Sequence, residues 1–106
     1  MLWFESMKIE KVKNNKELTI KPIGEINSVT APELEEVIKN DLGDVSSLIF
    51  DFSELEYLSS AGLRILLIAQ RLMGKKGQMR ILHVNSSVME ILTITGFNNV
   101  LDIEEA

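Results

Sequence analysis

The sequence predicts an α/β fold in which helices pack against a mixed, mostly parallel β-sheet. Residues 47–52 form a short and almost continuously apolar run, which is typical of a strand covered on both faces. A long apolar helix is expected over residues 59–73, and a second strand-like run follows at residues 78–84. This succession of strand, helix and strand predicts a parallel pair joined by a right-handed crossover.

The N-terminal part predicts a β-hairpin that precedes this parallel unit. Residues 7–12 alternate between polar and apolar, although imperfectly, and residues 17–23 do so more clearly. The turn formers Asn-Asn-Lys at residues 14–16 separate the two runs, which is a hairpin signal. Pro22 cannot donate to a strand ladder, so it marks a strand end, a bulge or an unpaired side of its strand.

A first helix is expected after a loop at residues 24–28. Thr30 is followed three residues later by Glu33, which predicts a capping box in which each side chain bonds the other residue's backbone N–H. The helix is expected to end at Leu42 and Gly43, because glycine commonly follows the last helical turn.

The C-terminal part predicts a turn, a strand, a helix and a last short strand. Two glycines and two lysines at residues 74–77 form the turn before the strand. Ser87 and Glu90 predict a second capping box at the start of the helix, which Gly96 ends. A short strand at residues 100–103 completes the expected order ββαβαβαβ.

The composition fits one soluble domain over residues 1–106, of which residues 1–6 are expected to be a loose N-terminal extension. The absence of cysteine excludes disulfides and thiolate metal sites. A net charge of −5 argues against nucleic acid as a partner. The longest apolar stretch, around residues 63–69, is too short to cross a bilayer, so no membrane insertion and a cytoplasmic location are expected.

Two serines, Ser59 and Ser60, open the long apolar helix. Ser59 is the expected N-cap, because a serine oxygen accepts a hydrogen bond from the unpaired N–H groups of the first turn. A cap does not require Ser60, which leaves this residue available as a contact or modification point. A phosphate on Ser60 would be favoured by the helix dipole and the free N–H groups, yet it would repel a partner with an acidic or apolar patch.

One face of this helix is expected to be exposed and the rest buried. At about 100° per residue, with Leu67 at its border, the exposed stripe contains Ser60, Arg64, Ile68, Arg71 and Lys75. The side chains expected to be buried are Leu63, Ile65, Leu66, Ala69, Leu72 and Met73. The stripe is interpreted either as a solvated amphipathic face or as a docking face with an aliphatic anchor and a basic rim.

The run IFDFSELEYLSSAGLRILL resembles the signature of the STAS domain, and in particular that of small bacterial anti-sigma factor antagonists. The resemblance extends over essentially the whole chain, because the segments GEIN, TAPEL and MEILTITGF occur in the family's order. It implies a STAS-type fold and regulation of transcription by partner switching. Unphosphorylated, such a protein binds an anti-sigma factor with serine-kinase activity, and phosphorylation of a loop serine then separates the pair.

The resemblance also implies which residues carry this function. The family's Asp-Ser-Ser/Thr-Gly pattern aligns on residues 59–62, so Ser60 is the expected phosphorylation site and Ser59, which replaces the aspartate, is the alternative. Asp51 matches an acidic position beside the switch loop, and Asn27 stands where the family often has aspartate. Together with the helix stripe, the expected partner-binding residues are Asn27, Ser28, Asp51, Ser59, Ser60, Gly62, Arg64, Leu67, Ile68 and Arg71. The alternative function is a STAS subunit that binds its partner constitutively in a transport or sensory complex.

Enzymatic activity is not expected of this chain. The single histidine, His83, lies in an apolar run and is interpreted as a core or edge residue rather than a general base. Ser-Ser-Ala-Gly is not a nucleophile elbow, no Gly-rich phosphate loop is present, and the acidic residues 51–56 lack the spacing of a metal site. Catalytic residues, metals and cofactors are therefore not predicted, and a monomer and a weak dimer both remain open.

Overall fold

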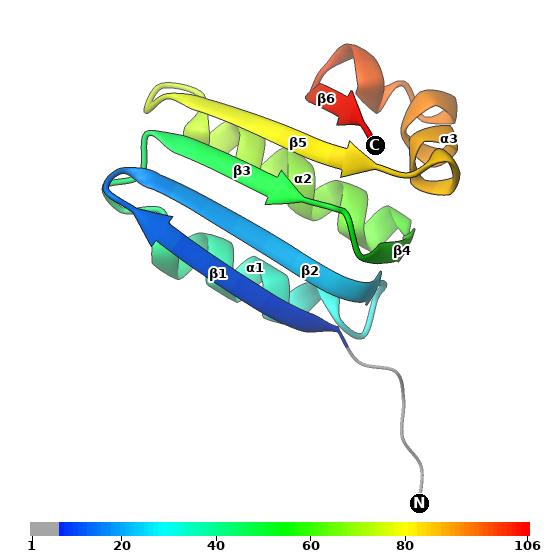
Figure 1. The fold of residues 1–106 in the computed structure, drawn as a ribbon, viewed down its shortest axis with the longest axis horizontal. Helices are drawn as coiled ribbons and strands as arrows, with labels where there is room; N and C mark the ends of the chain where they lie inside the picture. The colour runs from blue at the N-terminus through cyan, green and yellow to red at the C-terminus, as the bar shows by residue number, and fades with distance from the viewer. Residues whose placement is uncertain (1–6) are drawn as a thin grey trace, which may run out of the picture.

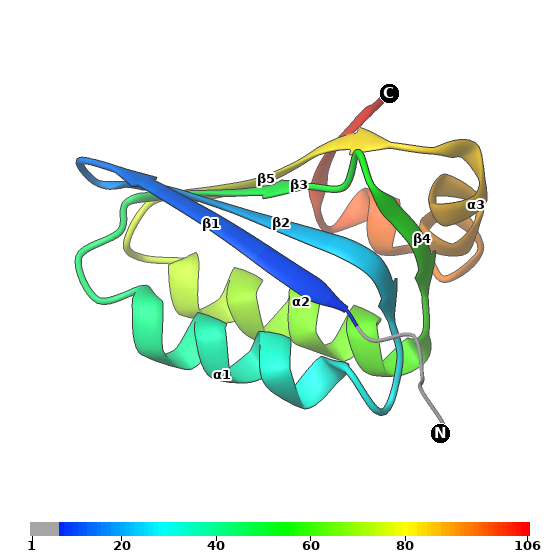
Figure 2. The same ribbon diagram turned by 60° about the horizontal axis from the view of Figure 1, so that its bottom comes forward.

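Within residues 7–106, which the computed structural model describes, helices α1 and α2 lie side by side on one face of a β-sheet (Figures 1 and 2). The expected extension at residues 1–6 lies outside the described residues. The strands are β1 (Lys8–Asn14), β2 (Glu17–Ile26), β3 (Ser47–Asp51), β4 (Leu55–Leu58), β5 (Gln78–Val84) and β6 (Asp102–Glu105). The helices are α1 (Ala31–Asp41), α2 (Ser60–Met73), α3 (Ser86–Ile94) and a 3-10 turn, η1 (Phe97–Asn99).

The predicted mixed, mostly parallel sheet is confirmed. Its strand order is β1-β2-β3-β5-β6, with β1 antiparallel to β2 and the other neighbours parallel. The expected element order lacked one strand, because β4 forms where a connector was predicted and pairs in parallel with the end of β2. The four residues of β4 are too few for a clear periodic signal, but Leu55 and Leu58 are buried and fasten it to the core.

Strand β2 is longer than expected and has two parallel partners in succession. It pairs with β3 over residues 17–20 and with β4 over residues 24–26, so the predicted loop at residues 24–28 is strand in its first half. Pro22 lies between these two pairings and faces only Ile9 of β1 in the strand register. The missing N–H of the proline therefore falls where β2 has an unpaired side, one of the three expected placements.

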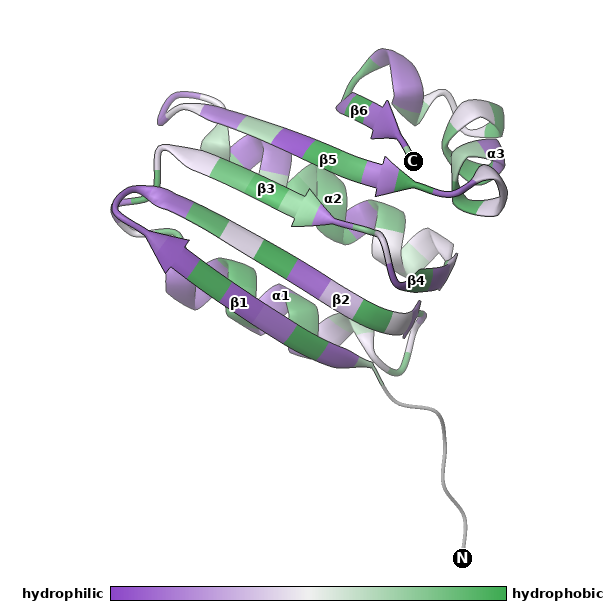
Figure 3. Ribbon diagram, in the orientation of Figure 1, coloured by the Kyte–Doolittle hydropathy of each residue, from purple (hydrophilic) through white to green (hydrophobic). Residues whose placement is uncertain are grey.

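The core lies between the sheet and the two parallel-running helices. In Figure 3 the strands alternate between hydrophilic and hydrophobic residues, which is the pattern of a sheet with one covered face. The buried side chains include Ile20 and Ile26 from β2, Phe50 from β3, Leu34 from α1 and Leu66 from α2. No helix in this part of the chain is long and apolar enough to cross a membrane.

The start of α1 differs from the predicted capping box. Thr30 is the N-cap residue as expected, but its side chain does not bond the first turn of the helix. Its hydroxyl instead donates to the carbonyl oxygen of Glu25 at 2.8 Å and accepts from the backbone N–H of Asn27 at 2.9 Å. The buried hydroxyl thus closes the loop that precedes the helix, and it leaves Glu33 without the predicted partner.

The predicted capping box at the start of α3 is also wrong, because the helix begins earlier than expected. Asn85 is the N-cap, and its Oδ1 accepts from the backbone N–H of Val88 at 2.8 Å. The Asn85 Nδ2 donates to the carbonyl oxygen of Leu55 at 2.8 Å, which joins α3 to β4. Asparagine caps a helix as well as serine does, and the Asn85 side chain bonds the neighbouring strand in addition.

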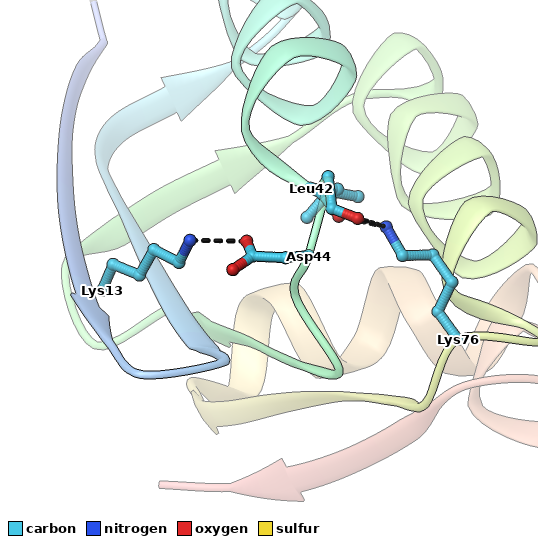
Figure 4. Close-up of polar contacts among 5 residues, drawn as sticks. Lys13, Leu42, Asp44 and Lys76 are labelled. Carbon is cyan, nitrogen blue, oxygen red and sulfur yellow. Dashed lines mark hydrogen bonds and ion pairs between the residues drawn. The ribbon is translucent and has the colours of Figure 1, made fainter.

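The turn after α2 is held by polar contacts rather than by glycine conformations. Neither Gly74 nor Gly77 has a positive φ. The Lys76 ammonium donates to the carbonyl oxygens of Leu42 and Gly43, at the C-terminal end of α1 (Figure 4). These carbonyls carry the negative end of the helix dipole, so a lysine from a distant turn completes α1.

Candidate functional site

The start of α2 is fastened to the end of β2, and the starts of α1 and α2 lie at the same end of the molecule (Figure 2). The backbone N–H of Ser59 donates to the carbonyl oxygen of Ile26 at 2.9 Å. The Ser59 Oγ accepts from the backbone N–H of Ala61 at 3.2 Å, and its carbonyl oxygen accepts from Leu63 at 3.0 Å. The predicted N-cap role of Ser59 is therefore confirmed, and this half-buried hydroxyl is occupied.

Ser60 is the first helical residue of α2 and is exposed. Its hydroxyl makes no hydrogen bond to any other residue of the described chain. The Ala61 that follows is half-buried against the core. The two adjacent serines thus differ in chemistry, because one hydroxyl caps the helix and the other points to solvent without a partner.

Gly62 is buried, which does not fit the expectation that it contacts a partner. An added Cβ would lie 2.4 Å from Leu58 Cδ1 and 2.8 Å from Ile26 Cγ2. The glycine therefore lets α2 approach β2 and β4 closely, and its role is to place the serine pair. Glycine is the residue that permits such a close approach of backbone to neighbouring side chains.

The loop between β2 and α1 lies beside the serine pair and is organised by Asn27. The Asn27 Oδ1 accepts from the backbone N–H groups of Val29 and Thr30 at 2.9 and 3.0 Å. Ser28 is exposed, and the side chain of Val29 is 79% exposed. The sequence did not single out Val29, because one exposed aliphatic residue in a loop is ordinary on a protein surface and gives no signal by itself.

Asp51 ends β3 as predicted, but the structure does not bring it to the serines. Its Oδ1 accepts from the backbone N–H of Ser53 at 3.0 Å, which starts the turn toward β4. Strand β4 separates Asp51 from Ser59 along the chain, and no hydrogen bond joins the two residues within 7–106. Asp51 therefore shapes the approach to β4 rather than the start of α2.

The predicted stripe on α2 is partly confirmed. Arg64 and Arg71 are exposed, and Leu67 is half-buried at the border. Ile68, expected as an exposed anchor, packs partly against the core, whereas Leu72, expected to be buried, is 44% exposed. Leu72 lies in the last turn of α2, at the edge of the buried face, where fewer side chains cover it.

The charged groups on α1 reach the stripe of α2. The Arg64 Nη2 lies 3.8 Å from Glu35 Oε1, while the Lys39 Nζ lies 2.8 Å from Glu35 Oε2. The hydrogen bond from Lys39 lowers the pKa of Glu35 against the opposing effect of desolvation, and the charges of Lys39 and then Arg64 lower it further. Glu35 is therefore chiefly the partner of Lys39, and Arg64 is held only loosely.

His83 is not a buried core residue. Its side chain is exposed, and its φ of 62° places it in the left-handed region. It lies where the pairing of β5 with β6 is irregular, between Ile81 and Val84. Among residues 7–106, no group of three His, Cys, Asp or Glu side chains could hold a metal ion.

A cleft of about 460 Å³ lies away from the serines, between β1 and the C-terminal end of α1. Two ion pairs line it, Lys11 with Asp41 at 2.7 Å and Lys13 with Asp44 at 2.6 Å, and Figure 4 shows the second of them. Both cations are already neutralised by these partners. None of the expected site residues lines this cleft, so the candidate site is a surface at the start of α2 rather than a cavity.

Comparisons with known proteins point to one family. The family model described as the STAS domain matches residues 8–106. BtrV of Bordetella bronchiseptica, a proposed anti-sigma factor antagonist, is 32% identical over 83 residues, which cover 76% of this chain and 71% of BtrV. An anti-sigma factor antagonist of Mycobacterium paratuberculosis has a TM-score of 0.86 at 25% identity, over 94% of this chain and 86% of that one.

Bacillus SpoIIAA in its phosphorylated form shares the fold, with a TM-score of 0.70 at 17% identity over 92% of this chain and 89% of SpoIIAA. The family match begins at the first residue of β1 and runs to the end of the chain, so it includes every helix and strand described here. Because the match has this extent and the identity to BtrV spans most of both proteins, the chain belongs to the STAS domain family, among the anti-sigma factor antagonists.

Proposed function

We propose that this chain regulates transcription by partner switching in the cytoplasm. In its unphosphorylated form it binds an anti-sigma factor that has serine-kinase activity, and the bound sigma factor is set free. The kinase then phosphorylates Ser60, and the two proteins separate. In this proposal the chain is the substrate and binding partner of a kinase and performs no catalysis itself.

The observation that carries the proposal is the different state of the two adjacent serines. The Ser59 hydroxyl is half-buried and accepts from Ala61, so phosphate there would remove a helix cap. The Ser60 hydroxyl is exposed and has no partner among the described residues. Phosphate on Ser60 would therefore leave the fold intact, because the first turn of a helix favours an anion.

The proposed docking surface consists of five exposed side chains around this serine and along α2, with the half-buried Leu67 at their border: Ser28, Val29, Ser60, Arg64 and Arg71. Asn27, Ser59 and Gly62 hold this surface in shape from behind rather than contact the partner. Its basic rim and small aliphatic area fit a partner patch that is acidic and apolar. A phosphate adds a charge of about −1.5 to −2 in the middle of the surface, which such a patch would repel.

Relatives support the proposal on two points. BtrV and the Mycobacterium paratuberculosis protein are described as anti-sigma factor antagonists, which fits an anti-sigma factor as the partner class. SpoIIAA has been solved in a phosphorylated form, so a protein of this fold accepts phosphate without losing its architecture.

The test uses the purified chain, its cognate anti-sigma factor and either ADP or ATP. With ADP we expect a stable complex, and with ATP we expect one phosphate on Ser60 and loss of the complex. The Ser60→Ala variant should bind with either nucleotide and take up no phosphate. Ser86→Ala is the matched control, because Ser86 is also an exposed first residue of a helix, and it should behave as wild type.

Stoichiometric phosphate on the Ser60→Ala variant, followed by release, would show that another residue is modified. A partner that stays bound with ATP while mass spectrometry finds no phosphate on any serine would favour the alternative, a constitutive STAS subunit of a transport or sensory complex.

A further inference from the structure

We propose that Arg64 is the intramolecular receptor of the Ser60 phosphate, and that it leaves Glu35 when the phosphate arrives. The inference concerns the phosphorylated state and therefore builds on the proposed function. Phosphorylation would then change the docking surface in two ways. The phosphate adds negative charge, and Arg64 is withdrawn from contact with the partner.

Arg64 lies on α2 within reach of a phosphate on Ser60. It follows Ser60 by four residues, so the two side chains are neighbours on one stripe, with their Cβ atoms about 5–6 Å apart. Helical side chains lean toward the N-terminus, which directs the guanidinium back over the turn that begins with Ser60. The planar guanidinium can donate two parallel hydrogen bonds to one phosphate group.

Arg64 is also held too loosely in the present structure to prevent it from turning toward a phosphate. Its side chain is 63% exposed, and its contact with Glu35 is long, at 3.8 Å. Glu35 keeps a closer partner in Lys39, at 2.8 Å, so it remains neutralised when Arg64 turns away. The exchange therefore replaces a weak contact without leaving an unpaired charge on α1.

The other cations of the stripe lie too far along the helix to reach a phosphate on Ser60. Arg71 follows Ser60 by eleven residues, about 16 Å along the axis, and Lys75 lies beyond the end of α2. Lys39 on α1 is bound to Glu35. Arg64 is thus the cation of the docking surface that can reach the phosphate, and after the exchange it can no longer face an acidic partner group.

The test measures the second ionisation of the phosphate itself. The full chain is prepared with phosphoserine installed at position 60 during synthesis, and its phosphorus NMR signal is followed against pH. In the wild-type chain, Arg64 should stabilise the dianion. The pKa should then be lower than in the Arg64→Gln variant by about 0.2 to 0.4 unit, the shift that corresponds to an (i, i+4) ion pair on a helix surface.

Arg71→Gln is the matched control, because it removes the same charge from the same exposed face of α2 and should leave the phosphate pKa unchanged. Arg64→Lys keeps the charge and loses the planar fork, so it should give an intermediate shift. The shift should shrink at high salt, as expected for an exposed pair. Circular dichroism verifies that the variants fold, which the exposure of Arg64 leads us to expect.

Equal pKa values in the wild-type and Arg64→Gln chains would overturn the proposal, and so would an equally large shift in Arg71→Gln. The experiment requires no kinase, because the phosphate is installed chemically. A kinase that ignores Ser60 would therefore refute the proposed function alone. An unshifted phosphate pKa would refute the role of Arg64 and leave release by the phosphate charge intact.

Discussion

The backbone N–H of Ser59 donates to the carbonyl oxygen of Ile26 at 2.9 Å, so the first residue before α2 is joined to the last residue of β2. Ile26 is buried, and Asn27 directly after it organises the loop that precedes α1. One main-chain hydrogen bond thus places the serine pair and the loop before α1 next to the same buried residue, Ile26. The serines are therefore presented by a rigid support.

Replacing Ser59 with alanine should destabilise the fold. The substitution removes the side-chain bond to Ala61, and loss of such a cap costs about 0.5–2 kcal/mol. Ser60→Ala is the control at the adjacent position and should change the free energy of unfolding by less than about 0.5 kcal/mol, as exposed substitutions usually do. Urea unfolding of both variants measures the difference, and equal stabilities would contradict the assigned roles.

Replacing Gly62 with alanine should also destabilise the fold, although alanine is the better helix former. Its Cβ would overlap Leu58 and Ile26, both buried and unable to move freely. Overpacking of this kind costs about 1–3 kcal/mol, which exceeds the gain of about 1 kcal/mol in helix propensity. Thermal unfolding measures the effect, and Gly43→Ala, with nothing within 4 Å of the added atom, is the control that should be nearly neutral.

Stability should depend on pH through the pair of Lys13 and Asp44. The hydrogen bond from Lys13 at 2.6 Å, aided by its charge, lowers the pKa of Asp44 below its ordinary value of 3.8. The folded state then binds the proton less readily than the unfolded state. The contribution of the pair is therefore present above pH 3.8 and lost as the pH falls through the folded value.

An NMR titration of the Asp44 carboxyl measures this effect directly. In the Lys13→Gln variant the pKa of Asp44 should return toward 3.8. The variant should be less stable than the wild type at neutral pH, and this difference in stability should vanish in acid. Lys8→Gln is the control, because the Lys8 contact with Glu10 is 4.0 Å long and both side chains are exposed. A pKa of Asp44 that does not respond to the Lys13 substitution would refute the assignment.

Reversing the charge of Arg71 should weaken partner binding while leaving the melting temperature unchanged. A rim charge acts mainly on the association rate, so we expect a loss of about tenfold that diminishes at high salt. A substitution at Ile68 would not give a clean test of the same surface. Ile68 packs against the core, so Ile68→Asp would lower stability as well as binding. Lys16→Glu, an exposed position in the β1–β2 turn, is the control for net charge in the same binding titration.

The elements that could be predicted from the sequence are those whose burial repeats with a clear period. The alternation of β2 and the long apolar face of α2 specify one buried side each, so α2 was expected where the structure places it, and β2 was expected except for its last three residues. Strand β4 escaped prediction because four residues with only two buried leucines give no period. Its pairing partner, β2, lies about 30 residues earlier in the chain, so the local sequence of β4 does not reveal the pairing.

Details of the candidate site depended on which of several competing hydrogen-bond partners each polar side chain takes. Ser59 has one nearby choice and was predicted correctly. The Thr30 hydroxyl could bond either the first turn of α1 or the preceding loop. In the structure it bonds the loop, through the backbone of Glu25 and Asn27. The burial of Gly62 and the neighbour relation of Arg64 and Glu35 follow from helix packing, which one sequence does not specify.

The interval around Pro22, where β2 changes from β3 to β4 as its parallel neighbour, also affects how such a domain can evolve. Neither ladder crosses the interval, so the two exposed residues Ser53 and Glu54 link two separately paired pieces of sheet, next to the buried Phe52. Insertions or deletions there would alter how far the serine pair projects while the main sheet keeps its register. Different partners could thus be accommodated by changes at Ser53 and Glu54, provided that Phe52 stays in the core.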